Sequence, residues 1–200
     1  TRRSSDLGTV NSWRHRLKKR IPRLKRARYT IVVEDEAFFV QGSPSGRKYW
    51  SPKGVPIKVP YTGSRKRLTV LGAITDKGRQ LFRTTTKGFN NKTFIPFVRA
   101  LLRRFKKVVL IMDRASTHRS KKMKKAFGKN KNLKVIYLPK ASPYLNASEH
   151  CWGRGKHDVM NSEYYPTFES MRNAVSEYYR TTKFNLDILA YFNRKTSEYA

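Results

Sequence analysis

The sequence predicts an α/β fold, in which a mixed β-sheet is flanked by helices, and two features lead to this prediction. A turn signal between two apolar runs in the first half of the chain indicates antiparallel strands. In the second half, helical periodicity alternates with short apolar runs, which is typical of parallel strands joined by helices. With 200 residues, 38% of them hydrophobic and 12% aromatic, the chain can fill the core of one domain.

The N-terminal segment, residues 1–28, is expected to be a basic arm in front of a domain at 29–200. A short helix is expected from about Asn11 to Arg20, ended by Pro22, with no amphipathic face long enough to pack by itself. The next segment, Tyr29 to Val40, has the β-branched and aromatic residues of a strand buried on both faces. Three acids, residues 34–36, interrupt its apolar run.

The middle of the chain is expected to contain a hairpin. Glycines and prolines from Gly42 to Pro56 indicate turns and short strands, with Trp50 as an anchor. Two strands, at 68–75 and 79–85, are joined by a turn at residues 76–78.

After the hairpin, helices and strands alternate. Apolar residues at helical spacing up to Phe105 predict a helix, with Asn91 as its cap. The strand Val108 to Met112 ends at Asp113, and Glu149 lies in a later helix. The remaining elements are a helix at 120–127, a strand at 133–138, a loop at 139–146, and helices at 168–179 and 185–192. This order is that of an RNase H-like fold.

The charge is extreme and unevenly distributed. The chain has 45 Lys and Arg against 13 Asp and Glu, a net charge of +32, which implies a polyanionic partner. Residues 1–30 and 99–134 hold 11 and 14 of the bases with one acid each, a pattern typical of a nucleic-acid surface. For any single run of lysines, an ordinary solvated surface remains the alternative.

Two further features bear on location. No apolar run approaches the roughly 20 residues that span a bilayer, and there is no secretory signal, so we expect a cytoplasmic protein without membrane contact. The single cysteine excludes an internal disulfide.

The few acids mark a candidate site. Asp35 and Asp113 lie on or after two apolar strands that we expect to be neighbours, and Glu149 lies in the first turn of a later helix. Carboxylates beside an apolar core require a cation, and three of them suffice for two Mg²⁺ ions in phosphodiester chemistry. Each acid also has an ordinary interpretation: Asp35 in an exposed edge strand, Asp113 as a cap, and Glu149 in a capping box with Asn146.

Three segments carry a resemblance to a known family. VEDE at 33–36, LIMDRASTH at 110–118 and LPKASPYLNASEHCW at 138–152 are similar to the three motif blocks of mariner-superfamily DDE transposases, particularly those of prokaryotic insertion sequences. The resemblance covers about residues 29–185. The family commonly has Asn at the position of Arg114, and further prolines where Lys140 and Ala147 stand.

The resemblance implies an RNase H-like catalytic domain that depends on Mg²⁺ or Mn²⁺ and cleaves and joins DNA strands. By motif position Asp35, Asp113 and Glu149 are the metal-binding catalytic acids, with Glu34 and Glu36 as competitors for the first role. It also implies DNA as partner, at transposon ends and target, and a homodimer in a synaptic complex, in the nucleoid of a prokaryotic cell.

Four more residues are candidates for contact with DNA: Arg114, His118, Arg119 and Lys156. His118 matches the second motif block and could position the substrate or the catalytic loop, or be a structural histidine. Trp152 is interpreted as core packing that fixes its helix. Two alternative functions are a structure-selective nuclease of RNase H-like fold, which cleaves without joining, and a catalytically inactive, truncated remnant that binds DNA through charge alone.

Overall fold

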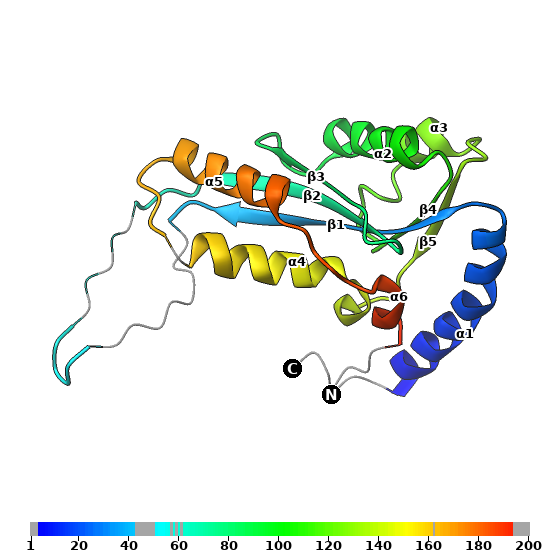
Figure 1. Cartoon of the computed structure of the whole chain (residues 1–200), viewed down its shortest axis with the longest axis horizontal. Helices are drawn as coiled ribbons and strands as arrows, with labels where there is room; N and C mark the ends of the chain where they lie inside the picture. The colour runs from blue at the N-terminus through cyan, green and yellow to red at the C-terminus, as the bar shows by residue number, and fades with distance from the viewer. Residues whose placement is uncertain are drawn as a thin grey trace.

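A five-stranded sheet forms the centre of the protein (Figure 1). The computed structural model describes residues 4–42, 51–56, 58, 60, 62–161 and 163–193. The strand order is β3-β2-β1-β4-β5, in which β1, β2 and β3 pair antiparallel while β4 and β5 continue parallel to β1. The strands are β1 Thr30–Val40, β2 Arg67–Thr75, β3 Gln80–Thr85, β4 Val108–Met112 and β5 Leu133–Tyr137.

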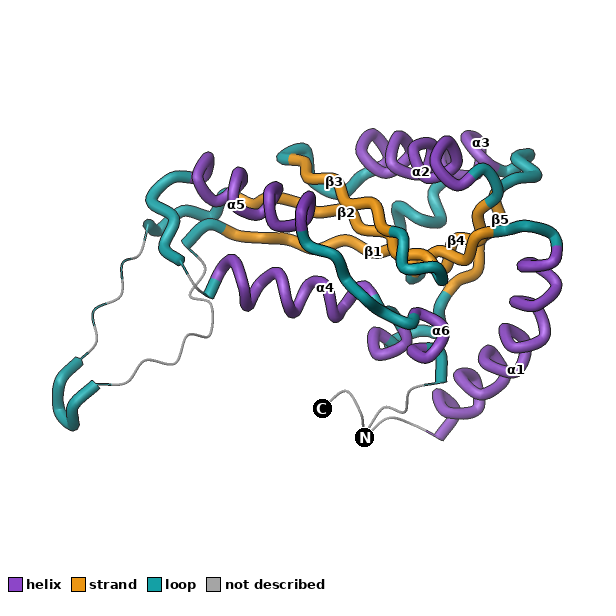
Figure 2. The backbone as a smooth tube through the Cα atoms, in the orientation of Figure 1, coloured by secondary structure: helices purple, strands orange, loops and turns teal. Residues whose placement is uncertain are grey.

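Helices cover both faces of this sheet (Figure 2). One face carries α2 Asn91–Phe105 and α3 Lys121–Phe127. The other carries α1 Ser4–Arg26, α4 Ser148–Gly155, α5 Phe168–Thr181 and α6 Ile188–Tyr191. A 3-10 turn, Pro143–Leu145, precedes α4, and a π-helical turn, Lys156–Met160, continues it. The predicted α/β, RNase H-like fold with a mixed sheet is therefore confirmed, and every predicted strand at 29–40 and 68–138 agrees with the structure to within one residue.

The N-terminal helix is present as predicted, but its predicted end at Pro22 and its predicted lack of a packing face are wrong. Helix α1 does not end at Pro22 but continues to Arg26. Its apolar residues, at spacings of three, four and seven, are buried in the core: Val10, Trp13, Leu17 and Leu24. Trp13 fastens the helix by donating its indole N–H to the carbonyl of Tyr137, 2.9 Å away at the end of β5. Packing against the sheet outweighs the hydrogen bond that the proline removes. The apolar residues of α1 thus belong to the same core cluster as residues of the sheet.

Smaller corrections concern helix ends and loops. The cap of α2 is Asn90, whose side chain accepts from the backbone of Lys92, whereas Asn91 accepts a hydrogen bond from Ser120. The last helix is shorter than predicted. The described residues between 42 and 66 contain no strand, and Trp50 lies outside the described residues. None of the described helices is both long enough and apolar enough to cross a membrane.

Gly72 in β2 makes room for a side chain on α4. It pairs with Asp35 across the β1–β2 ladder, and a Cβ atom there would collide with the Trp152 ring and lie 2.7 Å from Cε1 of Phe82. The Trp152 and Phe82 rings meet edge to face, with centroids 5.9 Å apart. The absence of a side chain at Gly72 therefore lets α4 approach the centre of the sheet.

We expect Gly72→Ala to lower the free energy of unfolding by about 1–3 kcal/mol, because two packed rings must move. Gly153→Ala is the control: it lies in the same helix as Trp152, a Cβ atom there meets nothing within 4 Å, and the change should raise stability by roughly 0.5–1 kcal/mol. Urea denaturation of both variants measures the difference. Equal effects would show that the contact of Gly72 with Trp152 does not constrain the fold.

Candidate active site

The parallel pairing of β1 with β4 brings two acids to one position. Val33 of β1 pairs with Ile111 of β4. Asp35 lies two residues after Val33, and Asp113 lies two residues after Ile111, directly after the last residue of β4. Strand β1 continues beyond this point, where β4 ends. The expectation that the two acids lie on neighbouring strands is therefore confirmed, and Asp35 lies in a central strand rather than at an exposed edge.

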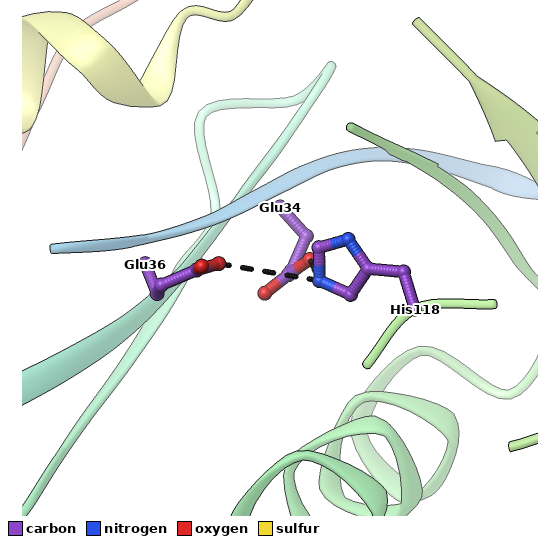
Figure 3. Close-up of side chains that lie close together, drawn as sticks. All are labelled: Glu34, Glu36 and His118. Atoms are coloured by element: carbon purple, nitrogen blue, oxygen red, sulfur yellow. Dashed lines mark ion pairs between the residues drawn. The ribbon is translucent and has the colours of Figure 1, made fainter. Parts of the chain in front are cut away.

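Alternation along β1 separates its three consecutive acids. Glu34 and Glu36 point toward the face covered by α2, where they meet His118 (Figure 3). The His118 Nε2 atom lies 3.3 Å from Glu34 Oε2 and 4.0 Å from Glu36 Oε2. Among the described residues, these three form the group of His, Cys, Asp and Glu side chains whose ligand atoms lie within 4.8 Å of one another. Asp35 points the other way, toward α4, where Trp152 donates to it.

A cleft opens on the side of Asp35. It has a volume of about 370 Å³, and Asp35, Asp113 and Glu149 all line it. Glu149 comes from the first turn of α4, which begins without a side-chain cap, so the capping box with Asn146 is not formed. Asn146 instead accepts a hydrogen bond from the backbone of Ser148 and donates to the carbonyl of Glu34, which ties the start of α4 to β1. Glu34, Glu36 and His118 do not line this cleft.

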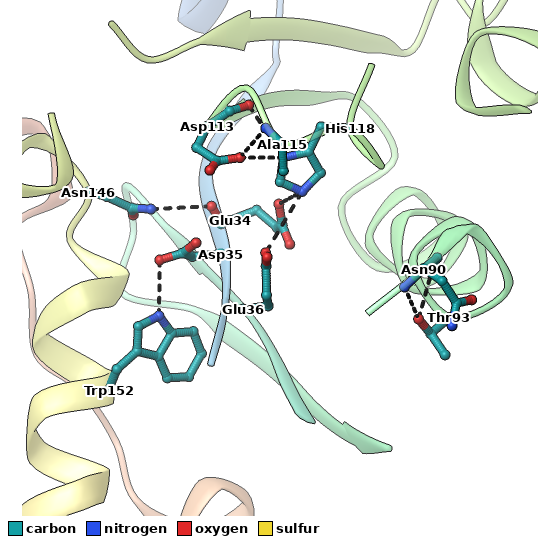
Figure 4. Close-up of polar contacts among 10 residues, drawn as sticks. All are labelled: Glu34, Asp35, Glu36, Asn90, Thr93, Asp113, Ala115, His118, Asn146 and Trp152. Carbon is teal, nitrogen blue, oxygen red and sulfur yellow. Dashed lines mark hydrogen bonds and ion pairs between the residues drawn. The ribbon is translucent and has the colours of Figure 1, made fainter. Parts of the chain in front are cut away.

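Trp152 holds the carboxylate of Asp35. Its indole N–H donates to Asp35 Oδ2 over 3.0 Å (Figure 4). The prediction that Trp152 is core packing is confirmed, since the residue is buried against Phe82 and Tyr179. The hydrogen bond itself was not predicted, because sequence spacing cannot show where an indole edge points.

Asp113 is held differently. Its side chain is 54% exposed, and its Oδ1 accepts from the backbone N–H of Ala115 at 2.8 Å and from His118 Nδ1 at 2.7 Å. The contact with Ala115 is a local turn of the kind that the cap interpretation describes. The hydrogen bond from His118 holds the pKa of Asp113 below its ordinary value.

Burial and mutual repulsion disfavour the ionised forms of Asp35, Glu36 and Glu149. Burial, and next the charge of Glu149, raise the pKa of Asp35 to about 7, although the bond from Trp152 acts in the opposite direction. Burial, and next the charge of Asp35, raise the pKa of Glu36 to about 8. Burial also raises the pKa of Glu149, while Lys156 acts against it. A cation in the cleft would relieve this repulsion.

The donor set of the cleft fits a hard divalent ion. Asp35, Asp113 and Glu149 offer only carboxylate oxygens, which Mg²⁺ and Mn²⁺ prefer, and the cleft is open to water and to a substrate phosphate. Both described bonds to the carboxylate of Asp113 fall on Oδ1, which leaves its Oδ2 outside them. The Glu34, Glu36 and His118 group is largely closed, since Glu34 is 0% and His118 1% exposed and the side chain of Glu36 is 15% exposed. None of the three lines the cleft.

Three of the four predicted DNA contacts lie on the surface. Arg114 lines the cleft, Arg119 donates to the carbonyl of Arg114, and Lys156 is close enough to Glu149 to influence its charge. All three are exposed. His118 differs from these three: its side chain has no exposed surface in this structure, which does not support the predicted direct contact with DNA.

Comparisons with known proteins agree with this geometry. The sequence profile of the DDE superfamily endonucleases matches residues 30–172. The insertion element IS630 uncharacterized 39 kDa protein of Shigella sonnei is 26% identical over 140 residues, which cover 67% of this chain and 39% of that protein.

Two solved structures share the fold. The Mos1 strand transfer complex superposes with a TM-score of 0.69 at 16% identity, over 96% of this chain and 59% of the Mos1 chain. The Mos1 mariner paired end complex with Mn gives a TM-score of 0.68 at 16% identity, over 96% and 58%. This chain thus spans about two fifths of the relative and about three fifths of the Mos1 chains. Since the profile covers well over half of the chain and includes Asp35, Asp113 and Glu149, this protein belongs to the DDE superfamily endonucleases.

Proposed function

We propose that this chain is the catalytic domain of a DNA transposase, in which Asp35, Asp113 and Glu149 hold two divalent metal ions, Mg²⁺ or Mn²⁺. The observation that carries the proposal is the meeting of three carboxylates, from β1, the end of β4 and the start of α4, in one open cleft. Metal ions bound in this way activate an attacking oxygen and stabilise a leaving one during phosphodiester displacement. The likeness to the Mos1 strand transfer complex supports strand joining in addition to cleavage.

The basic residues around the cleft complement a DNA backbone. Arg114 and Lys140 line it, and Lys156 lies close to Glu149. These side chains hold and orient the phosphates, while the carboxylates fix the position at which a strand is cut. The substrate is DNA at transposon ends and, in the joining step, at a target site.

Two further parts of the proposal rest on relatives. The Mos1 structures are paired end and strand transfer complexes, which supports action as a homodimer in a synaptic complex. The similar insertion-element protein is bacterial, which supports a place in the nucleoid of a prokaryotic cell.

Nicking of supercoiled plasmid in Mg²⁺ or Mn²⁺ tests the proposal. Asp35→Asn, Asp113→Asn and Glu149→Gln should each lower the rate by about 100-fold or more, a loss of roughly 3 kcal/mol of transition-state stabilisation. Glu169→Gln, an exposed acid on α5, is the control and should retain activity. Joined products from transposon-end substrates support a transposase, whereas cleavage without joining would indicate a nuclease. DNA binding with no metal-dependent cleavage would contradict both.

The raised pKa of Asp35 predicts a pH-dependent response to Mg²⁺. Because its pKa in the folded protein is about 7, against 3.8 ordinarily, ionisation of Asp35 costs folding stability as pH rises from about 4 to above 7 when no ion is present. A bound cation offsets this cost, whereas at pH 6 it must also displace a proton. The increase in melting temperature on adding Mg²⁺ should therefore be larger at pH 8 than at pH 6. Asp35→Asn should reduce that difference, and an equal increase at both pH values in the unaltered protein would argue against an ion at Asp35.

The surface bases predict a salt-dependent interaction with DNA. Arg114→Ala, Arg119→Ala and Lys156→Ala should each weaken binding to any DNA sequence and reduce the slope of log K against log salt by about one. Arg172→Ala on α5, a base that pairs with Glu169 and does not line the cleft, is the control. Fluorescence anisotropy at several salt concentrations measures the slopes. Unchanged slopes for all three would place the DNA on another face.

A further inference from the structure

His118 connects the acid at the end of β4 to a buried acid on the far face of β1. Its Nδ1 lies 2.7 Å from Asp113 Oδ1 and its Nε2 lies 3.3 Å from Glu34 Oε2 (Figure 4). We propose that His118 is a positioning residue, held in place by Glu34, that orients the carboxylate of Asp113 for metal binding. This inference rests on the proposed function of Asp113.

Asp113 requires such a partner because little else confines it. It follows the last residue of β4, and more than half of its side chain is exposed, so it is free to adopt other rotamers. The bond from Ala115 is a local contact between residues two apart in the chain. His118 is fully buried and therefore supplies a fixed reference point.

The ring of His118 is fixed by packing on its sides and by a carboxylate at its end. The rings of Phe94 and Phe89 lie against it, with centroids 4.7 and 5.2 Å away. These apolar contacts prevent the ring from tilting, but they do not determine which edge faces Asp113. The carboxyl group of Glu34, 3.3 Å from Nε2, bears on this choice, because only one orientation of the ring places its two nitrogen atoms toward Asp113 and Glu34 at once.

Glu34 has no other evident role in the fold. It is 0% exposed, and neither of its carboxylate oxygens has a hydrogen-bond partner, so its burial costs free energy unless a donor faces it. His118 Nε2 faces Glu34 Oε2 at 3.3 Å, and a proton carried by either of these two atoms would let one donate to the other. A carboxylate, an imidazole and a second carboxylate thus form a chain from the core to the cleft, the arrangement by which proteins commonly orient metal-binding side chains.

The parallel with Asp35 strengthens the inference. Each of these two acids accepts a hydrogen bond from a buried aromatic N–H group, from Trp152 on α4 for Asp35 and from His118, in the loop after β4, for Asp113. In each case the described side-chain bond engages a single carboxylate oxygen. The two aromatic donors lie on opposite faces of the sheet, so β1 and the end of β4 are braced from both sides.

Two substitutions at His118 separate positioning from packing. In His118→Asn, the amide nitrogen can occupy the place of Nδ1 and still donate to Asp113. In His118→Gln, the amide reaches toward Glu34 and the donor to Asp113 is lost, although glutamine fills more of the space. We expect His118→Gln to raise the Mn²⁺ concentration that gives half-maximal plasmid nicking by about 10-fold or more, and His118→Asn to raise it distinctly less.

Glu34→Gln provides a second variant with a smaller change in volume. It retains the size of the side chain but weakens its hold on Nε2, and we expect it to raise the half-saturating Mn²⁺ concentration several-fold. Glu169→Gln is again the control. The same order of variants is expected in a measurement that does not require activity, the increase in melting temperature on adding Mn²⁺.

The outcomes distinguish this inference from the proposed function. Positioning is supported if His118→Asn stays close to the unaltered protein while His118→Gln needs much more Mn²⁺ for half-maximal nicking and gains less melting temperature on adding Mn²⁺. Equal loss in both His118 variants, or a lower melting temperature with unchanged Mn²⁺ response, would overturn it and leave His118 a packing residue. If the unaltered protein does not nick DNA, the proposed function fails, while the Mn²⁺-dependent melting of the variants still decides whether His118 positions Asp113.

Discussion

The parallel pairing of β1 with β4 is the constraint on which the site depends. Its register places Asp35 and Asp113 the same distance beyond a paired position, so two carboxylates meet at the middle of the sheet. Helices cover both strands on either side, so an ionised carboxylate here is largely removed from water, which costs free energy. The raised pKa values of Asp35 and Glu36 express that cost. In the proposed function a cation offsets these charges, and the basic rim of the cleft guides a phosphate backbone toward it.

The surrounding structure orients the acids rather than neutralising them. Trp152 reaches Asp35 only because Gly72, the residue on β2 that pairs with Asp35, has no side chain. His118 reaches Asp113 from the opposite face and is itself backed by Glu34. The packing of α2 and α4 against the sheet is thereby coupled to the geometry of the carboxylates, and the stability of the fold and the precision of the site rest on the same contacts.

Much of this arrangement could be predicted from the sequence, and the exceptions have physical causes. The β-branched runs and the turn at Gly78 locate the strands because both signals are local. The three acids could be identified through motif blocks, and the period-two alternation of a strand already implies that Glu34 and Glu36 face away from Asp35. Helix α1 was mistaken because Pro22 suggested an end, although the spacing of Val10, Trp13 and Leu17 indicated a buried face. The burial of His118 could not be predicted, since it depends on how a loop after β4 folds back against Phe94.

The most direct test of the central claim is a crystal structure of the protein soaked with Mn²⁺, with anomalous scattering recorded to locate the ions. Two groups of carboxylates compete for them, the open cleft of Asp35, Asp113 and Glu149 and the closed group of Glu34, Glu36 and His118. We predict anomalous density in the cleft, within coordination distance of Asp35 and Asp113, and none beside His118. Density confined to the closed group, or none in the cleft at saturating Mn²⁺, would contradict the assignment of the active site.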